Sequence, residues 1–141
     1  MKHTTFGALG AGLGLCLLLT APQTAAAQRT APPGGEYRKV STLVALPDFL
    51  PGLGTLYVDP ATLPAGPFLA YDHQGKLVSS IFMIPLSEMN AHKAFTDLKV
   101  AKERVDHVDI VFNAGHPGVA EPHYHVILWY VSAQAEATLV K

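Results

Sequence analysis

The sequence predicts a strand-dominated α+β domain, in which a mostly antiparallel sheet carries one packed helix. Two short apolar runs, 67–71 and 77–84, flank a turn in which Gly75 can adopt a positive φ angle, a pattern typical of a β-hairpin. Residues 105–112 alternate with a period of two, as strands do, and 122–131 is predicted to be the last long strand. Only one stretch shows the pattern of an amphipathic helix. Strands therefore outnumber helices in the predicted fold.

The remaining elements follow from turn residues and from periodicity. Strands are predicted at 40–46 and 55–58, because a proline or an Asp-Pro pair ends each of these β-prone runs. The helix is expected to begin at Ser87, whose hydroxyl suits an N-cap. Its apolar side, which we expect to pack on the sheet, consists of Ala91, Ala94, Phe95 and Leu98.

The first 27 residues are typical of a secretory signal peptide. Lys2 and His3 precede an apolar run at 6–20, and three small residues at 25–27 suit a cleavage site before Gln28. Lipid attachment at Cys16 is the rival interpretation. We reject it because Leu15 is not the small residue that normally precedes a lipidated cysteine. The mature chain is therefore expected to be secreted or periplasmic, without a membrane anchor after cleavage.

After the signal, residues 28–39 contain Pro-Pro-Gly-Gly and are predicted to form a disordered spacer before a single β-rich domain at 40–141. The mature chain has no cysteine, so packing, a metal or self-association must stabilise it. Without Lys2, acidic residues exceed basic residues by two, and no basic patch stands out. Nucleic acid is therefore not expected as a partner.

The strand at 122–131 is apolar on both sides. His123, His125, Ile127, Trp129 and Val131 point one way, and Tyr124, Val126, Leu128 and Tyr130 point the other. A domain with one helix covers one sheet face easily, so the other face needs a loop layer such as 47–66 or another subunit. We therefore expect a homo-oligomer.

His123 and His125 form a candidate metal-ligand pair, since both imidazoles project from one strand face about 7 Å apart. If 105–112 pairs with 122–131 so that partner numbers sum to roughly 234, Asp109 falls near His125. His116 and Glu121 lie in the connecting loop, close to His123. The sequence thus suggests a divalent metal such as zinc or copper, held by His123, His125 and one of Asp109, His116 or Glu121.

Two other interpretations stay open. In the first, the histidines lie at the more solvent-accessible end of a buried strand and bind nothing. In the second, they serve acid/base catalysis without a metal. A cupin is rejected, because Trp129 and Tyr130 stand where its glutamate is required and too little chain follows. A lone His-x-His is also too weak a signal for carbonic anhydrase. His73 is interpreted as a turn residue, and His92 as a residue at the helix margin.

Several segments resemble a small family of secreted bacterial domains of unknown function that is named after a Thermus thermophilus protein. They are 57–72, the Met-Ile-Pro-Leu at 83–86, the Asn-x-Gly-His-Pro at 113–117 and the Pro-His-Tyr at 122–124. The resemblance implies an exported, self-assembling single domain and assigns no reaction. In the pattern of that family, many members carry an aspartate where this chain has His125 and a histidine where it has Ile127, so the resemblance transfers only His116 and His123.

The sequence therefore predicts an exported single-domain protein of no established activity. It is expected to be a self-associating envelope or secreted module with a binding or structural role. The alternative is a metal-binding protein or metal-dependent enzyme that uses the His-x-His strand. An enzymatic role is uncertain and is the less expected of the two.

Overall fold

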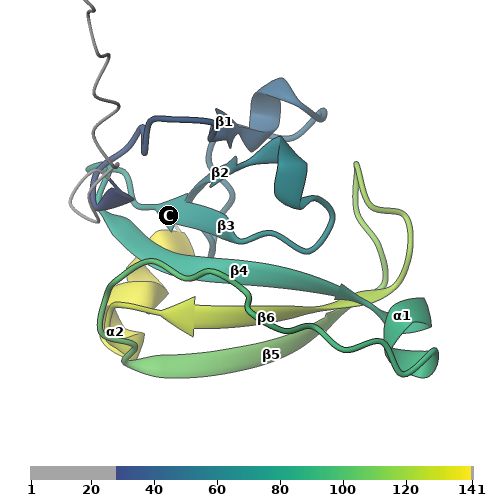
Figure 1. The fold of residues 1–141 in the computed structure, drawn as a ribbon. Helices are drawn as coiled ribbons and strands as arrows, with labels where there is room; N and C mark the ends of the chain where they lie inside the picture. Colours follow the sequence, from purple (N-terminus) through teal and green to yellow (C-terminus); the bar gives the residue numbers. More distant parts are fainter. Residues whose placement is uncertain (1–27, 141) are drawn as a thin grey trace, which may run out of the picture.

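A computed structural model describes residues 28–140 of the 141-residue chain, and the predicted signal peptide at 1–27 lies outside the described residues. The described part contains one six-stranded antiparallel sheet with the strand order β1-β2-β3-β4-β6-β5 (Figure 1). The strands are β1 (Arg38–Lys39), β2 (Thr55–Val58), β3 (Phe68–Tyr71), β4 (Leu77–Pro85), β5 (His107–Asn113) and β6 (His123–Trp129). The short helices are α1 (Leu86–Asn90) and α2 (Ala133–Glu136), with 3₁₀ turns η2 (Val40–Thr42), η3 (Pro60–Thr62) and η4 (Ala137–Val140). The predicted strand-dominated α+β class is confirmed.

β4 forms the centre of the sheet, and all nine of its residues are buried. It pairs with β3 through the predicted hairpin, in which Gly75 has a φ angle of 74°. Its other neighbour is β6, so both of its backbone edges are hydrogen-bonded. Apolar side chains on both faces of this strand are consistent with a position inside a covered sheet.

Alternation along β6 defines two sheet faces. We call the side that carries His123, His125, Ile127 and Trp129 the histidine face, and the side that carries Tyr124, Val126 and Leu128 the opposite face. On the histidine face, Ile81 of β4 lies beside Ile127, and Met83 lies beside His125. The apolar core on this face includes Val58, Phe68 and Trp129, so the histidines lie at the margin of the main core.

Different segments cover the two faces. Val44, Leu46, Phe49 and Leu53 pack against the core of the histidine face, together with buried Leu139 of η4. A loop layer, one of the two possible covers expected from the sequence, therefore lies over this face. The opposite face is crossed by the irregular segment 91–106, drawn in green in Figure 1, which inserts Ala101 beside Leu69 and Tyr71.

The predictions of one strand and of the helix length are wrong. Residues 40–46 do not form a strand, because β1 ends at Lys39 and Val40 begins a 3₁₀ turn. The helix expected from Ser87 has five residues and buries none of them, and its N-cap is Pro85. His92 has a φ angle of 57°, which ends helical geometry. The chain then continues in irregular form, and within 91–106 Ala101 is buried while Leu98 and Val100 stay exposed.

Residues 28–39, expected to be a disordered spacer, make specific contacts in the structure. The Ala31 N–H donates to the Gly75 carbonyl at 2.8 Å, and the Tyr71 hydroxyl donates to the Gln28 carbonyl at 2.7 Å. This segment therefore lies against the β3–β4 hairpin. Within residues 28–140, no helix is both long enough and apolar enough to cross a membrane.

Candidate functional site

Three histidines meet at one end of the histidine face. His123 and His125 lie on β6, and His116 reaches them from the β5–β6 loop. The ring centroids are 4.8 Å apart for His123 and His125, and 4.9 Å apart for His116 and His123. One ring nitrogen from each lies within 4.8 Å of one from each of the others. Three of the predicted site residues thus form a single cluster.

Backbone carbonyls fix the tautomers of two of these rings. The Nδ1 of His123 lies 2.7 Å from the Glu121 carbonyl oxygen, and the Nδ1 of His116 lies 3.0 Å from that of Pro117. A carbonyl oxygen only accepts, so each Nδ1 carries the hydrogen. The neutral rings therefore keep a lone pair on Nε2. Imidazole ligands in metal sites are commonly oriented by such a hydrogen bond from the other ring nitrogen.

The third ring is held close to the second. The Nε2 atoms of His123 and His125 lie 3.0 Å apart, and in the neutral state the hydrogen between them comes from His125. Burial lowers the pKa of His125 to about 4, with smaller contributions from His123 and His116. Neutral His125 is therefore available as a ligand over the whole physiological pH range.

The loop that carries His116 is shaped by two glycines. Gly115 has a φ angle of 124°, and a Cβ there would lie 2.6 Å from the Ala120 carbonyl oxygen. Gly118 has a φ angle of 88° and packs against Val44. Between them, His116 and Val119 exchange backbone hydrogen bonds at 2.9 Å. The Gly-His-Pro-Gly sequence therefore makes a tight turn that points His116 back toward β6.

A pocket of about 340 Å³ opens beside the cluster. Its walls come from the loop layer at 40–58, from β4 and from the His116 loop, and most of its lining is aliphatic. His116, His125 and Asn113 supply the polar groups at the histidine end. Sequence reasoning missed this pocket. The only signal was a high density of leucines in a Pro- and Gly-rich loop.

Asp109 and Glu121, the other two predicted metal ligands, lie elsewhere. β5 pairs with β6 as expected, but the register is shifted by two residues, so Val111 lies opposite His125 and Asp109 lies opposite Ile127. The side chain of Glu121 accepts a hydrogen bond from the Ser87 N–H at 3.3 Å, while its backbone carbonyl orients His123. The shift keeps the faces of β5 because it is an even number of residues.

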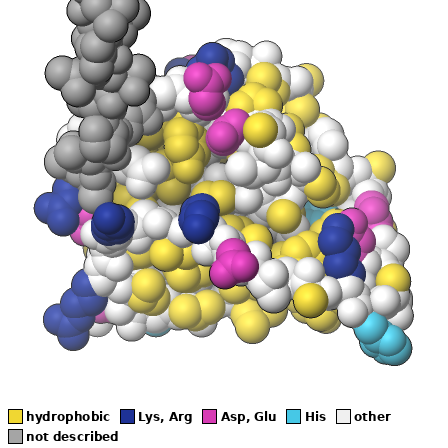
Figure 2. Space-filling view, viewed as in Figure 1, with side chains coloured by type: hydrophobic (Ala, Val, Ile, Leu, Met, Phe, Trp, Pro, Cys, Tyr) yellow, Lys and Arg dark blue, Asp and Glu magenta, His cyan; other side chains and the backbone are white. Residues whose placement is uncertain are grey.

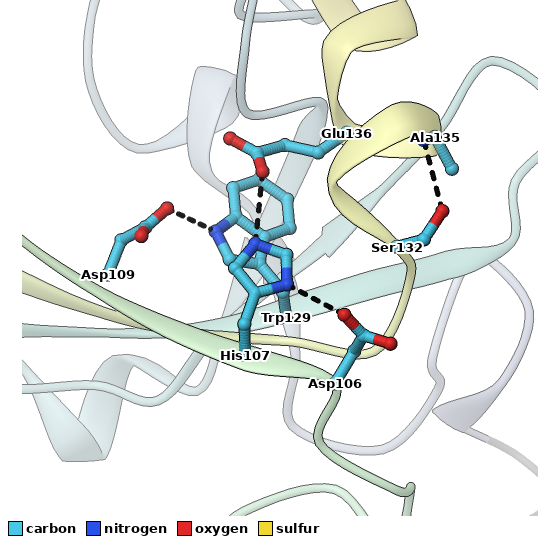
Figure 3. A network of polar contacts seen from close by, with 7 residues as sticks. All are labelled: Asp106, His107, Asp109, Trp129, Ser132, Ala135 and Glu136. Atoms are coloured by element: carbon cyan, nitrogen blue, oxygen red, sulfur yellow. Dashed lines mark hydrogen bonds and ion pairs between the residues drawn. The ribbon is translucent and has the colours of Figure 1, made fainter.

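Asp109 instead belongs to a second polar cluster, shown in Figure 3, on the same sheet face near α2. Its carboxylate accepts a hydrogen bond from the indole of Trp129 at 2.9 Å. His107 lies between Asp106 and Glu136, with ring-nitrogen distances of 3.0 and 3.1 Å. The Asp106 hydrogen bond makes the largest contribution and raises the pKa of His107; burial opposes it, and Glu136 and Asp109 add further increases. Both nitrogens of His107 are thus engaged, which favours a cationic anchor for α2 over a metal ligand.

The fold and the cluster define a small β-rich domain with a three-histidine site on one sheet face. The chain is similar to a solved structure, a hypothetical protein from Thermus thermophilus designated TTHB210, with 48% sequence identity and a TM-score of 0.62. The match covers 67% of this chain and 93% of the Thermus chain. The chain therefore belongs to the family of this Thermus protein. No protein-family model and no curated protein matches the chain.

Proposed function

We propose that the protein binds a divalent transition metal through His116, His123 and His125. The observation that carries this proposal is the convergence of three imidazoles, two of which have their Nδ1 hydrogens fixed on backbone carbonyls. Tetrahedral zinc with bonds of about 2.0–2.1 Å needs ligand nitrogens roughly 3.3 Å apart. The Nε2 atoms of His123 and His125 are already 3.0 Å apart. A metal between them requires His125 to carry its hydrogen on Nδ1, which frees the lone pair of its Nε2. The nearest ring nitrogen of His116 lies within 4.8 Å of theirs.

Three histidine ligands leave the fourth position of a tetrahedral ion open, as in zinc sites where water or another small ligand occupies that position. That position would face the apolar pocket, because His116 and His125 both line it. The described lining holds no aspartate or glutamate that could act as a general base. We therefore expect binding of a metal and a ligand, and we assign no reaction.

Calorimetric titration of zinc and copper into the purified mature chain tests this function. We expect one equivalent of metal to bind to the wild type, and no binding above background in a His123→Ala/His125→Ala double variant. A His73→Ala/His92→Ala variant is the matched control, since it removes two exposed histidines outside the cluster. Equal binding by all three proteins, or no binding by the wild type, would overturn the proposal.

Self-association is a second candidate, supported by the exposed apolar surface of β5. Val108, Ile110 and Phe112 project from the opposite face and are 51%, 68% and 52% exposed. β5 is an edge strand without proline or lysine, so its backbone is open to pairing. Figure 2 shows hydrophobic side chains along the edge of the molecule where Figure 1 places β5. We propose that β5 pairs with β5 of a second copy.

A two-fold axis at Ile110 gives this pairing a compatible register. Antiparallel pairing about Ile110 places Asp109 opposite Val111 of the second copy, and Val108 opposite Phe112. No like charges then face each other, and the central contact is apolar. An axis at Asp109 would instead bring two carboxylates together.

Export is proposed on sequence grounds alone. Residues 1–27 have the order of features of a secretory signal. We expect mass spectrometry of the protein recovered from the periplasm or medium to find Gln28 as the first residue. An uncleaved chain that is confined to the cytoplasm would contradict this proposal.

A further inference from the structure

The pocket beside the three histidines has one polar end and is otherwise apolar. Its polar lining groups, Asn113, His116 and His125, are adjacent in the β5–β6 region. The rest of the wall is aliphatic and includes Val44, Leu53 and Leu56. A ligand that satisfies both regions has an apolar body and a polar head at the histidine end.

The charges of the pocket lining and of the metal ion limit which head groups can bind there. None of the described residues that line the pocket is lysine, arginine, aspartate or glutamate. Three neutral imidazoles would leave the full charge of a divalent ion uncompensated in apolar surroundings, which is costly. An anionic head group on the open coordination position would offset this charge. Carboxylate oxygen is an established zinc ligand.

Asn113 adds a group that can orient such a head. Its side-chain oxygen accepts a hydrogen bond from the Gly115 N–H at 2.9 Å. The amide NH₂ of the same side chain is then the end that can donate to a second carboxylate oxygen. The metal position and this donor together suit a two-oxygen head group.

We propose that the pocket binds an aliphatic monocarboxylate, with its carboxylate on the histidine-bound metal and its chain against the leucine-rich wall. This inference rests on the proposed metal site and names the ligand class of that site. A volume of about 340 Å³ is at the small end of ligand pockets, which typically measure about 300–1,000 Å³. It therefore suits a short or medium chain.

Calorimetry with octanoate tests the proposal on zinc-loaded and metal-free protein. We expect octanoate to bind zinc-loaded protein at least about tenfold more tightly, because only the ion supplies the positive charge. Across butanoate, hexanoate and octanoate, the affinity should rise about fourfold for each methylene that becomes buried. Equal affinity for both forms of the protein, or no dependence on chain length, would overturn the assignment.

Two variants locate the chain of the ligand. Leu53→Trp fills part of the pocket and should weaken octanoate binding at least about tenfold while zinc affinity stays unchanged. Leu98→Trp, at an exposed position outside the lining, is the matched control, and circular dichroism verifies that both variants fold. Octanoate binding that survives Leu53→Trp would overturn the proposed location. Zinc binding without octanoate binding would refute this inference and leave the proposed metal site standing, whereas absence of zinc binding would refute both.

Discussion

The Nε2 atoms of His123 and His125 lie 3.0 Å apart, and the other ring nitrogen of His123 is held by the Glu121 carbonyl. This arrangement points two imidazoles at one position from the same strand face. A strand places alternate side chains on one face, and the tight turn at 115–118 supplies the third imidazole. The cluster is therefore built largely from local geometry, which is why its residues could be found from sequence.

Saturating zinc should stabilise the folded protein. Metal at about one hundred times its dissociation constant adds about 2.7 kcal/mol to the free energy of unfolding. For a domain of this size, that corresponds to a rise in Tm of about 10 °C. Scanning calorimetry with zinc, and again after a chelator is added, measures the effect. His116→Ala should lose most of the zinc-induced rise, and a rise of full size in that variant would exclude His116 as a ligand.

Local sequence patterns predicted the β3–β4 hairpin and the two faces of β6. The register of β5 was less accessible, because the loop at 114–122 is long enough to allow several registers. An even shift preserves which residues face the core, so the burial pattern does not distinguish between them. Asp109 was consequently assigned to the wrong cluster, two residues along the ladder from the histidines.

The short extent of the helix and the presence of the pocket could not be predicted for a different reason. Both depend on tertiary packing. Ala91, Ala94 and Leu98 have helical spacing, but two of them are small and bury little apolar area. The pocket is formed by loop residues around Val44 and Leu53 that meet β4 only in the folded chain. No local periodicity encodes such a contact.

The position of Asp109 can be tested by substitution. Asp109→Ala removes the acceptor of the Trp129 indole, which is only 1% exposed, so the free energy of unfolding should fall by about 1.5–3 kcal/mol. Zinc affinity should stay unchanged, because Asp109 lies outside the three-histidine cluster. Urea unfolding and zinc titration measure the two effects. A large loss of zinc affinity in the folded variant would restore Asp109 as a ligand.

Ser79 and Ser80 provide a matched pair of buried hydroxyls in β4. Both are fully buried, but Ser80 accepts a hydrogen bond from Tyr130 at 2.8 Å, whereas the Ser79 hydroxyl has no partner within the described residues. Ser80→Ala should reduce the free energy of unfolding by about 1 kcal/mol. Ser79→Ala should leave it unchanged or raise it by about 1 kcal/mol, because an unpartnered hydroxyl is removed from the core. Equal losses in both variants would contradict this difference in hydrogen bonding.

The proposed pairing of β5 predicts that a single charge abolishes self-association. Ile110→Lys would place two lysines opposite each other at the two-fold axis, so the variant should be monomeric at micromolar concentration. Val140→Lys changes a similarly exposed residue, 61% against 68%, at a site away from β5 and should leave the assembly intact. Light scattering and mass photometry measure the mass. A monomeric wild type, or an Ile110→Lys variant that still associates, would refute this interface.

The anchoring of α2 by His107 predicts a pH-dependent stability. The pKa of His107 is raised in the folded state, chiefly by its hydrogen bond to Asp106 and also by Glu136 and Asp109, so the folded state binds the proton more tightly than the unfolded state. This contribution is fully present below the ordinary histidine pKa of 6.5, and it is lost as the pH rises through the raised value. The difference in urea midpoint between wild type and His107→Gln should therefore be larger at about pH 5.5 than at about pH 9. His92→Gln, at an exposed histidine outside this cluster, should show no such change, and a His107→Gln difference that is equal at both pH values would exclude the charged anchor.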